Sequence, residues 1–342
     1  MRAVGYATTG EVDVLEELDL PIREPGAGEV RVLIMVSGVN PTDWKSRAGA
    51  VRTPIPPGRH QVPHLDGAGV VDAVGAEVDP GLLGRRVWLW LVAYLRLEGT
   101  AQEYAVIPAS IVEPLPDDAS FELGAALGVP FMTAHRALTL HQDGPRRLAP
   151  GVLAGQHVLV AGGAGAVGNA AIQLARWAGA TVITTVSNAA KHQLATAAGA
   201  HHVINYREQD VVEEVRRISP AGVDTIVEVS PAANVDIDCA VLATNGIVAV
   251  YAVDGGGSFT LPVRALMTLN AGWHFLLLYT VTAQACRDAA DAIGAALLDS
   301  AVRVGPEAGL PLHRFPLSDV AGAHRAVHGG AVGKVLVDVA AP

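Results

Sequence analysis

The chain has 342 residues, which is long enough for two domains. Its formal net charge of −10 argues against a nucleic-acid partner, because phosphate binding needs a basic face. Two cysteines are too few for a disulfide framework or a thiolate zinc site. We expect a cytoplasmic protein, since there is no apolar signal core and the longest apolar run, 275–281, is far below the roughly 18 residues of a membrane span.

The first 125 residues contain short strand-like runs separated by Pro- and Gly-rich turns, a texture typical of a mostly β domain. The strongly apolar run 30–36 leads into a polar stretch that holds Asn40, Asp43 and Lys45. Such a stretch has three readings: a metal site, the floor of a catalytic pocket, or the turn that ends a strand.

From about 157 to 270, strand-like runs alternate with helical segments. In the helical segment 167–178 the apolar residues recur at spacings of three and four, the stripe of a helix lying on a sheet. Repeated strand–helix–strand units imply α/β architecture with a doubly wound parallel sheet. The tail from about 271 extends this sheet or returns to the first domain, and periodicity alone does not decide between them.

A glycine loop is the strongest motif of the chain. Gly163, Gly165 and Gly168 fit G-x-G-x-x-G directly after a strand and at the start of an amphipathic helix, which is the context of a dinucleotide site. Backbone N–H groups at such a helix start bind the pyrophosphate. The predicted loop comprises Gly163, Ala164, Gly165, Ala166, Val167 and Gly168.

The residues after the second strand, 181–186, indicate which dinucleotide binds. An NAD site usually places a carboxylate there, and this chain has none. Ser187, Asn188 and Lys191 could instead hold the additional 2′-phosphate of NADPH. The alternative is that Ser187 caps the next helix and Lys191 is merely solvated.

These segments together resemble the zinc-independent NADPH:quinone oxidoreductases of the medium-chain dehydrogenase/reductase superfamily, of the zeta-crystallin type. The resemblance runs through "SGVNPTDWKSRAG", "HLDGAGVVDAVGAEV", "AGQHVLVAGGAGAVGNAAIQLAR" and "GKVLVDV". It implies a GroES-like, mostly β catalytic domain from 1–125 and 271–342, and a Rossmann NADP(H)-binding domain from 126–270. It also implies a homodimer formed by edge strands of the Rossmann sheets near Gly272–Tyr279, a segment whose alternative interpretation is an ordinary buried strand.

The resemblance implies a site without metal. Zinc alcohol dehydrogenases of the same superfamily carry a ligand Cys where this chain has Asn40, and a ligand His where it has Leu65. Two pairs of histidines are spaced four apart, His60 with His64 and His324 with His328. The first pair lies among Pro and Gly, and the second lacks the Glu of an H-E-x-x-H motif, so neither predicts a zinc site.

Without a metal, hydride transfer from NADPH to a quinone or enone needs only hydrogen-bond donors for the developing oxyanion. Asn40 is the first candidate donor, with a turn role as the alternative. Asp43 orients neighbours or caps a short helix, and Asp66 is expected to be structural. Lys45 stands where many relatives have Tyr; it could donate a proton, bind an acidic substrate group, or simply reach solvent.

Two further positions follow from the resemblance. Thr133 is expected near the nicotinamide and the substrate, or as a core helix residue, and Tyr206 is expected beside the 2′-phosphate. The loop that begins at Val253 follows the fifth strand and is expected near the nicotinamide, because ligands lie at the carboxyl ends of parallel strands. The loops 51–64 and 88–100 are expected to shape the mouth of the pocket.

Two other functions stay open at this point. One is an enoyl reductase acting on a thioester or biosynthetic intermediate, and the other is an NADPH-binding structural protein of the crystallin kind. Neither the physiological acceptor nor the choice between one- and two-electron reduction follows from the sequence.

Overall fold

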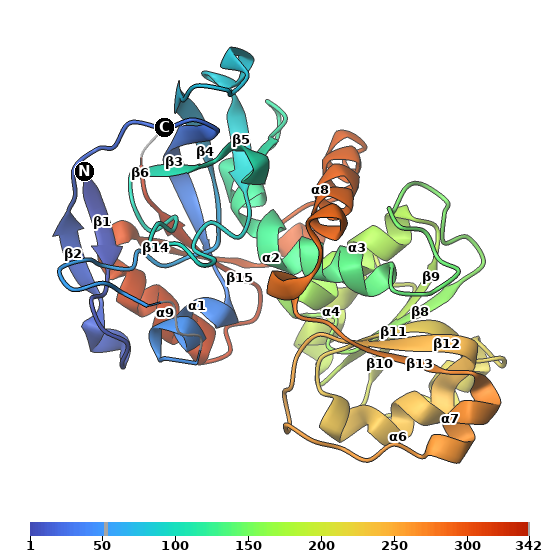
Figure 1. The fold of residues 1–342 in the computed structure, drawn as a ribbon. Coiled ribbons are helices and arrows are strands. Elements are labelled where there is room, and N and C mark those ends of the chain that lie inside the picture. Colours follow the sequence, from blue (N-terminus) through green and yellow to red (C-terminus); the bar gives the residue numbers. More distant parts are fainter. Residues whose placement is uncertain (51–53, 341–342) are drawn as a thin grey trace. The chain divides into compact units, whose positions relative to one another are not determined.

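The computed structural model describes residues 1–50 and 54–340 (Figure 1). The chain forms two compact units, one from Met1–Val129 with Leu312–Pro342 and the other from Pro130–Pro311. Helix α2 (Phe121–Leu138) crosses the boundary between them and contains Pro130. Each unit is described by itself below.

The first unit is built on a seven-stranded sheet in the order β14-β15-β3-β4-β5-β7, with β6 also paired to β3. Its long strand β3 has alternate side chains fully buried, because one face packs on the core. The strands and helices are β1 (Arg2–Gly5), β2 (Glu16–Asp19), β3 (Glu29–Val39), α1 (Pro41–Arg47), β4 (Asp66–Val74), β5 (Arg86–Leu89), β6 (Tyr104–Pro108), β7 (Val112–Pro114), β14 (Leu312–Pro316), α9 (Val320–His328) and β15 (Lys334–Asp338).

The second unit is a six-stranded sheet in the order β10-β9-β8-β11-β12-β13, and every pair in it is parallel. The chain runs outward from β8 to β10 and then returns to β11 beside β8, which makes a topological switch point between β8 and β11. The elements are β8 (His157–Val160), α3 (Ala166–Trp177), β9 (Thr181–Val186), α4 (Ala189–Ala197), β10 (His202–Asn205), α5 (Val211–Ile218), β11 (Val223–Glu228), α6 (Pro231–Val241), β12 (Leu242–Val250), α7 (Val263–Leu269), β13 (Gly272–Phe275) and α8 (Ala283–Leu298).

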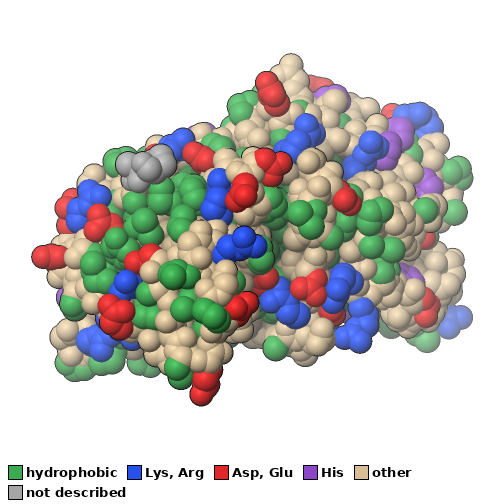
Figure 2. Space-filling model, turned by 90° about the horizontal axis from the view of Figure 1, so that it is seen from above, with side chains coloured by type: hydrophobic (Ala, Val, Ile, Leu, Met, Phe, Trp, Pro, Cys, Tyr) green, Lys and Arg blue, Asp and Glu red, His purple; other side chains and the backbone are tan. Residues whose placement is uncertain are grey.

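Short 3₁₀ helices connect these elements: η1 (Val12–Val14), η2 (Pro80–Leu82), η3 (Ala109–Ile111), η4 (Leu278–Thr280), η5 (Pro306–Ala308) and η6 (Leu317–Asp319). The core of the parallel sheet is aliphatic, with Leu159, Ile183, Ile226 and Val248 all buried. Within the described part of the chain, none of the helices combines the length and apolarity that a bilayer crossing requires. Figure 2 shows acidic and basic side chains interspersed on the face that it draws.

The predicted combination of a mostly β unit and a doubly wound parallel-sheet unit is confirmed. The second domain boundary differs from the expected one at 270/271. Strand β13 pairs with β12 in parallel, with Ile247 opposite Gly272, so residues 272–311 belong to the parallel-sheet unit. The tail returns to the first unit only at Leu312, because β14 and β15 join the sheet of β3.

Candidate dinucleotide and active sites

The glycine loop forms a tight turn between β8 and α3. The glycine with the left-handed turn conformation is Gly162, which directly precedes the first glycine of the G-x-G-x-x-G motif. Gly162 adopts a φ of +71°, a conformation that favours glycine. A Cβ on Gly163 would lie 2.1 Å from Oγ1 of Thr184, and one on Gly168 would lie 2.4 Å from the carbonyl oxygen of Gly162. Glycine is therefore required here for close packing of the loop, the helix and β9.

The start of α3 fits the pyrophosphate of a dinucleotide. Its N-cap, Gly165, has no capping side chain, and a Cβ there would meet only the carbonyl oxygen of Gly162 at 3.5 Å. The first N–H groups of a helix have no acceptor inside the helix, so those of Ala166, Val167 and Gly168 remain for an anion. The geometry thus leaves room for a phosphate at the place where donors are unsatisfied.

A cavity of about 570 Å³ adjoins this loop, a size common for small-molecule sites. Gly162, Thr185, Tyr206 and Ser230 line it, and they follow or end the strands β8 to β11. Ligands of doubly wound sheets bind at this edge, outside the carboxyl ends of the strands. The cavity is consequently suited to the nucleoside half of a dinucleotide.

The residues predicted to hold a 2′-phosphate gather at the ends of β9 and β10. The backbone N–H of Tyr206 donates to the carbonyl of Val186 at 3.0 Å, which places half-exposed Tyr206 beside the segment that begins at Ser187. Asn188 is the N-cap of α4, because its Oδ1 accepts from the backbone N–H of Lys191 at 2.9 Å. The alternative reading in which Ser187 caps this helix is therefore wrong. Phosphate binding by Ser187, Asn188, Lys191 and Tyr206 stays a prediction.

Two residues predicted near the nicotinamide lie in the second unit. Val253 is 63% exposed in the loop after β12, and the N–H of Asp254 ties this loop to the carbonyl of Val229 at 3.2 Å. Thr133 lies on α2 and is 6% exposed. Their contacts with a cofactor stay predictions.

In the first unit, Asn40 and Asp43 begin helix α1. Asn40 is the N-cap, and its backbone N–H donates to Oδ2 of Asp43 at 2.7 Å. This bond matches the expected capping role of Asp43. Both residues are buried, with exposed fractions of 2% and 4%.

The side chain of Asn40 is hydrogen-bonded to two other buried residues. Its Nδ2 donates to Oδ2 of Asp66 at 2.7 Å, and its Oδ1 accepts from Nζ of Lys334 at 2.7 Å. Lys334 Nζ also lies 3.4 Å from the same Asp66 oxygen. Sequence reasoning missed Lys334, although the rarity of lysine, at positions 45, 191 and 334 only, was the available signal. We call Asn40, Asp43, Asp66 and Lys334 the Asn40 cluster.

Burial controls the charges of the Asn40 cluster. It raises the pKa of Asp43 to about 8, and it raises the pKa of Asp66 against the opposing attraction of Lys334. It lowers the pKa of Lys334, and Asp66 and Asp43 oppose that shift. One ammonium faces two carboxyl groups here, so a protonated Asp43 at neutral pH leaves the cluster electrically balanced.

The histidines spaced four apart do not act as pairs. His60 contacts Glu16 at 3.0 Å, and the ring of His328 stacks on Trp44 with centroids 4.1 Å apart. The structure brings together His64 and His324 instead, with their Nε2 atoms 3.0 Å apart in the core. Among the described residues, no group of three or more His, Cys, Asp or Glu is arranged to hold a metal ion.

A directed chain of hydrogen bonds fixes the tautomers of these two histidines. The hydroxyl of Thr100 donates to the carbonyl of Asp66 at 2.6 Å, so it must accept from Ser37, which lies 2.6 Å away. Ser37 must then accept from Nδ1 of His64 at 2.8 Å. His64 Nε2 is consequently an acceptor, and His324 Nε2 donates to it.

The chain of hydrogen bonds begins at Arg47, whose Nε donates to Nδ1 of His324 at 3.4 Å. Because it ends on a backbone carbonyl, it holds α1, α9 and the loop before β4 together rather than conducting protons. His64 has a φ of +81°, a left-handed backbone conformation that non-glycine residues rarely adopt.

Lys45 lies on the outer side of α1. Its side chain is exposed, and Nζ lies 5.8 Å from the ring centroid of Trp44. Its role toward a substrate stays a prediction.

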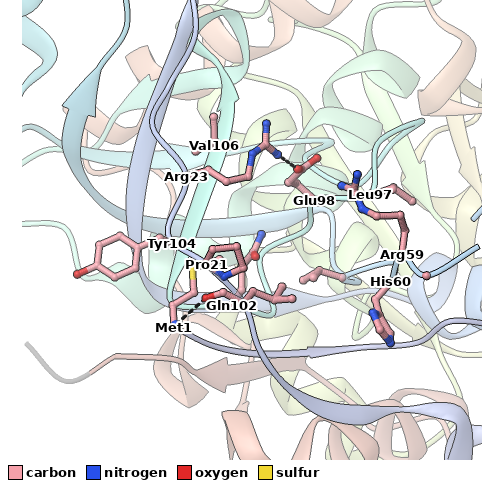
Figure 3. A pocket seen from close by; sticks show the side chains of 13 residues that line it. Met1, Pro21, Arg23, Arg59, His60, Leu97, Glu98, Gln102, Tyr104 and Val106 are labelled. Atoms are coloured by element: carbon pink, nitrogen blue, oxygen red, sulfur yellow. Dashed lines mark hydrogen bonds and ion pairs between the residues drawn. The ribbon is translucent and has the colours of Figure 1, made fainter. Parts of the chain in front are cut away.

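A cavity of about 570 Å³ also lies within the first unit (Figure 3). Arg59 and His60 of the predicted mouth loop 51–64, and Leu97 and Glu98 of the loop 88–100, line it. Residues 51–53 of the first loop fall outside the described residues. Asn40 does not line this cavity, so it is separate from the Asn40 cluster.

Comparisons with known proteins agree with this geometry. Residues 26–117 match the model of the alcohol dehydrogenase GroES-like domain, and residues 166–293 match the model described as zinc-binding dehydrogenase. The human quinone oxidoreductase is 31% identical over 342 aligned residues, which cover 98% of this chain and 97% of the relative.

Two solved structures are similar over almost their whole length. A mycobacterial protein complexed with NADPH shares 28% identity with a TM-score of 0.79, covering 98% of this chain and 99% of that one. An NAD-dependent alcohol dehydrogenase shares 27% identity with a TM-score of 0.82, covering 99% and 100%. Together with the GroES-like and Rossmann units, these similarities show that the chain belongs to the quinone oxidoreductase family of the medium-chain dehydrogenase/reductase superfamily.

Proposed function

We propose that the protein is a zinc-independent oxidoreductase that transfers hydride from NADPH to a quinone or an enone. Family membership supports the reaction class, and the mycobacterial relative complexed with NADPH supports the cofactor. The observation that carries the zinc independence is the ammonium of Lys334, 2.7 Å from Oδ1 of Asn40. This ammonium already donates to one lone pair of the amide oxygen, and its charge repels a dication.

In this proposal bound NADPH supplies the hydride. The first-turn N–H groups of α3 bind its pyrophosphate, and Ser187 and Lys191 bind its 2′-phosphate. Asn40 donates a hydrogen bond from Nδ2 to the oxyanion that develops on the acceptor. An amide nitrogen has two hydrogens, and Asp66 takes only one of them.

One assay panel tests the proposal against its alternatives. NADPH oxidation is followed with ortho- and para-quinones, small enones and an enoyl thioester, before and after dialysis against a chelator. We expect turnover of quinones or enones that survives dialysis. Preference for the thioester would favour the enoyl reductase, and tight NADPH binding without any turnover would favour the structural protein.

The preference for NADPH over NADH needs its own measurement, because one similar structure is titled an NAD-dependent alcohol dehydrogenase. Titration of intrinsic fluorescence with each dinucleotide measures the two Kd values. We expect tighter binding of NADPH. Equal Kd values would contradict the roles of Ser187 and Lys191.

We also propose a homodimer that pairs the β13 strands of two copies. Strand β13 is an edge of the parallel sheet, and its neighbourhood exposes Phe275 and Leu277 at 69% and 54%. Unpaired edge strands with apolar side chains favour association. The cytoplasm is the proposed compartment, since NADPH chemistry and two unpaired cysteines fit a reducing environment.

A further inference from the structure

All three lysines of the sequence lie in the part of the chain that the structure describes, and Lys334 is the one among them whose side chain is fully buried, with 1% of its surface exposed. Lysine is almost never fully buried unless it is paired, because removing an ammonium from water is costly. Its position follows from the sheet: Val335 pairs with Val39 in the antiparallel ladder of β15 and β3. Lys334 precedes Val335 on β15, and Asn40 directly follows Val39 at the end of β3. The two residues therefore meet just beyond the last pair of the ladder.

The contacts of Lys334 determine which way the amide of Asn40 points. Nζ lies 2.7 Å from Oδ1 of Asn40, and Oδ2 of Asp66 lies 2.7 Å from its Nδ2. A flipped amide would set its NH₂ against the ammonium and its oxygen against the carboxylate. Both contacts would be repulsive, so only one orientation survives.

The same contacts strengthen Asn40 as a donor. An amide whose oxygen accepts from an ammonium has more polarised N–H bonds, and the effect is large where water is excluded. Asp66 holds one hydrogen of Nδ2, so the direction of the second is fixed as well. Electrostatic stabilisation of an oxyanion depends on donors held in place in this manner before the reaction.

We infer that Lys334 is a positioning residue for hydride transfer, which acts by orienting and polarising the amide of Asn40. This inference rests on the proposed function, because it needs an acceptor whose oxygen Asn40 contacts. It assigns to a lysine near the C-terminal end of the sequence a role in the reaction at the start of α1.

The test removes the charge and keeps the shape. Lys334→Met alone leaves Asp66 buried without a cation and could prevent folding, so the second variant combines Lys334→Met with Asp66→Asn. Thermal unfolding and the Kd for NADPH, measured by fluorescence titration, establish that the variants are folded and bind cofactor. The matched control removes the exposed ion pair Arg314–Asp338 of the same sheet, by Arg314→Met with Asp338→Asn.

We expect the Lys334/Asp66 double variant to bind NADPH within about twofold of the wild type. Its kcat with a para-quinone should fall by about tenfold, less than the ~10²–10³ typical of deleting an oxyanion donor outright. The control pair should leave kcat unchanged. A fall in kcat at constant NADPH affinity is not the signature of a general loss of structure.

Coupling to Asn40 distinguishes positioning from a purely structural role. If Lys334 acts through Asn40, then adding Asn40→Ala to the double variant should lower kcat by less than Asn40→Ala lowers it in the wild type. Full additivity, or a double variant with wild-type kcat, would overturn the inference while the proposed function stands. A wild-type protein that reduces no quinone or enone would overturn both.

Discussion

At the scale of single residues, the residues expected around the 2′-phosphate and the Asn40 cluster are brought together in different ways. Of the residues expected around the 2′-phosphate, Ser187, Asn188 and Lys191 are neighbours in sequence at the start of the helix after β9, and Tyr206 joins them from the end of β10. The Asn40 cluster instead joins residues up to 294 positions apart. The first set is therefore open to substitution one residue at a time, whereas each member of the second depends on the others.

Replacing Lys191 by Ala should raise the KM for NADPH much more than the KM for NADH. The ammonium would otherwise attract the 2′-phosphate that only NADPH carries. Steady-state kinetics with both dinucleotides and one quinone measure the two ratios. Lys191→Arg, which keeps the charge, should retain most of the preference, and equal effects on both cofactors would refute the assignment.

Replacing Lys45 by Ala should selectively weaken turnover of acceptors that carry a carboxylate. The side chain is exposed and cationic, and its pairing with an acidic substrate group is worth on the order of 0.2–1 kcal/mol at an exposed position. The measurement compares kcat/KM for a carboxylated quinone with that for its methyl ester. An equal change for both acceptors would leave Lys45 without a role in acceptor recognition.

At the scale of elements, the turn from β8 into α3 and the neighbouring strands show what local sequence predicts. The G-x-G-x-x-G spacing located the helix start correctly, because turn, helix and strand are contiguous. Periodicity alone did not predict the pairing of β13 with β12, since an apolar run of this length fits either unit equally well, whereas the family resemblance placed residues 272–279 at an edge of the Rossmann sheet. Residues that meet only through the register of two distant strands, such as Lys334 and Asn40, leave no local pattern in the sequence.

The substitution Gly168→Ala should weaken NADPH binding and destabilise the protein. The new Cβ would lie 2.4 Å from the carbonyl oxygen of Gly162, so the loop must move away from α3. Fluorescence titration with NADPH and thermal unfolding measure the two effects.

The matched control is Gly294→Ala in the middle of α8, where no atom beyond the neighbouring backbone of the helix itself lies within 4 Å of the new Cβ. It should stabilise the protein by roughly 0.5–1 kcal/mol, because alanine favours a helix. If both substitutions had the same sign, steric crowding would not explain the requirement for Gly168.

The substitution Phe275→Lys on β13 should convert the proposed dimer into a monomer. It places a charge beside an edge strand, which opposes pairing with a second copy. Light scattering coupled to size-exclusion chromatography reports the mass. Leu298→Lys on α8, at a side chain 77% exposed, is the control and should not change the mass; a wild-type monomer would contradict the proposal directly.

At the scale of the whole molecule, buried ionisable groups make stability depend on pH. Burial lowers the pKa of His324 to about 3, and burial with the nearby His324 lowers the pKa of His64 well below its usual value. Arg47 of α1 and Lys334 of β15 add positive charge near the pair. Both histidines are therefore neutral in the folded state at neutral pH.

The unfolded chain binds protons at these histidines below about pH 6.5, whereas the folded chain does not. Their contribution to stability is complete above pH 6.5 and declines as the pH falls toward the folded pKa. Each should cost on the order of 1.4 kcal/mol per pH unit in that window. Denaturant unfolding from pH 7 to pH 4 of the wild type and of His64→Asn with His324→Gln measures the difference. A pH-independent difference would mean that the pair titrates normally.

The first unit closes with strands from opposite ends of the sequence, because β15 completes the sheet begun by β3. A ribosome synthesises β3 almost three hundred residues before Lys334, and the continuous parallel-sheet unit, 130–311, emerges in between. That unit is continuous in the sequence and can fold as it emerges, whereas the Asn40 cluster cannot form until Lys334 has been synthesised. The nascent chain therefore completes its parallel-sheet unit before it completes the Asn40 cluster.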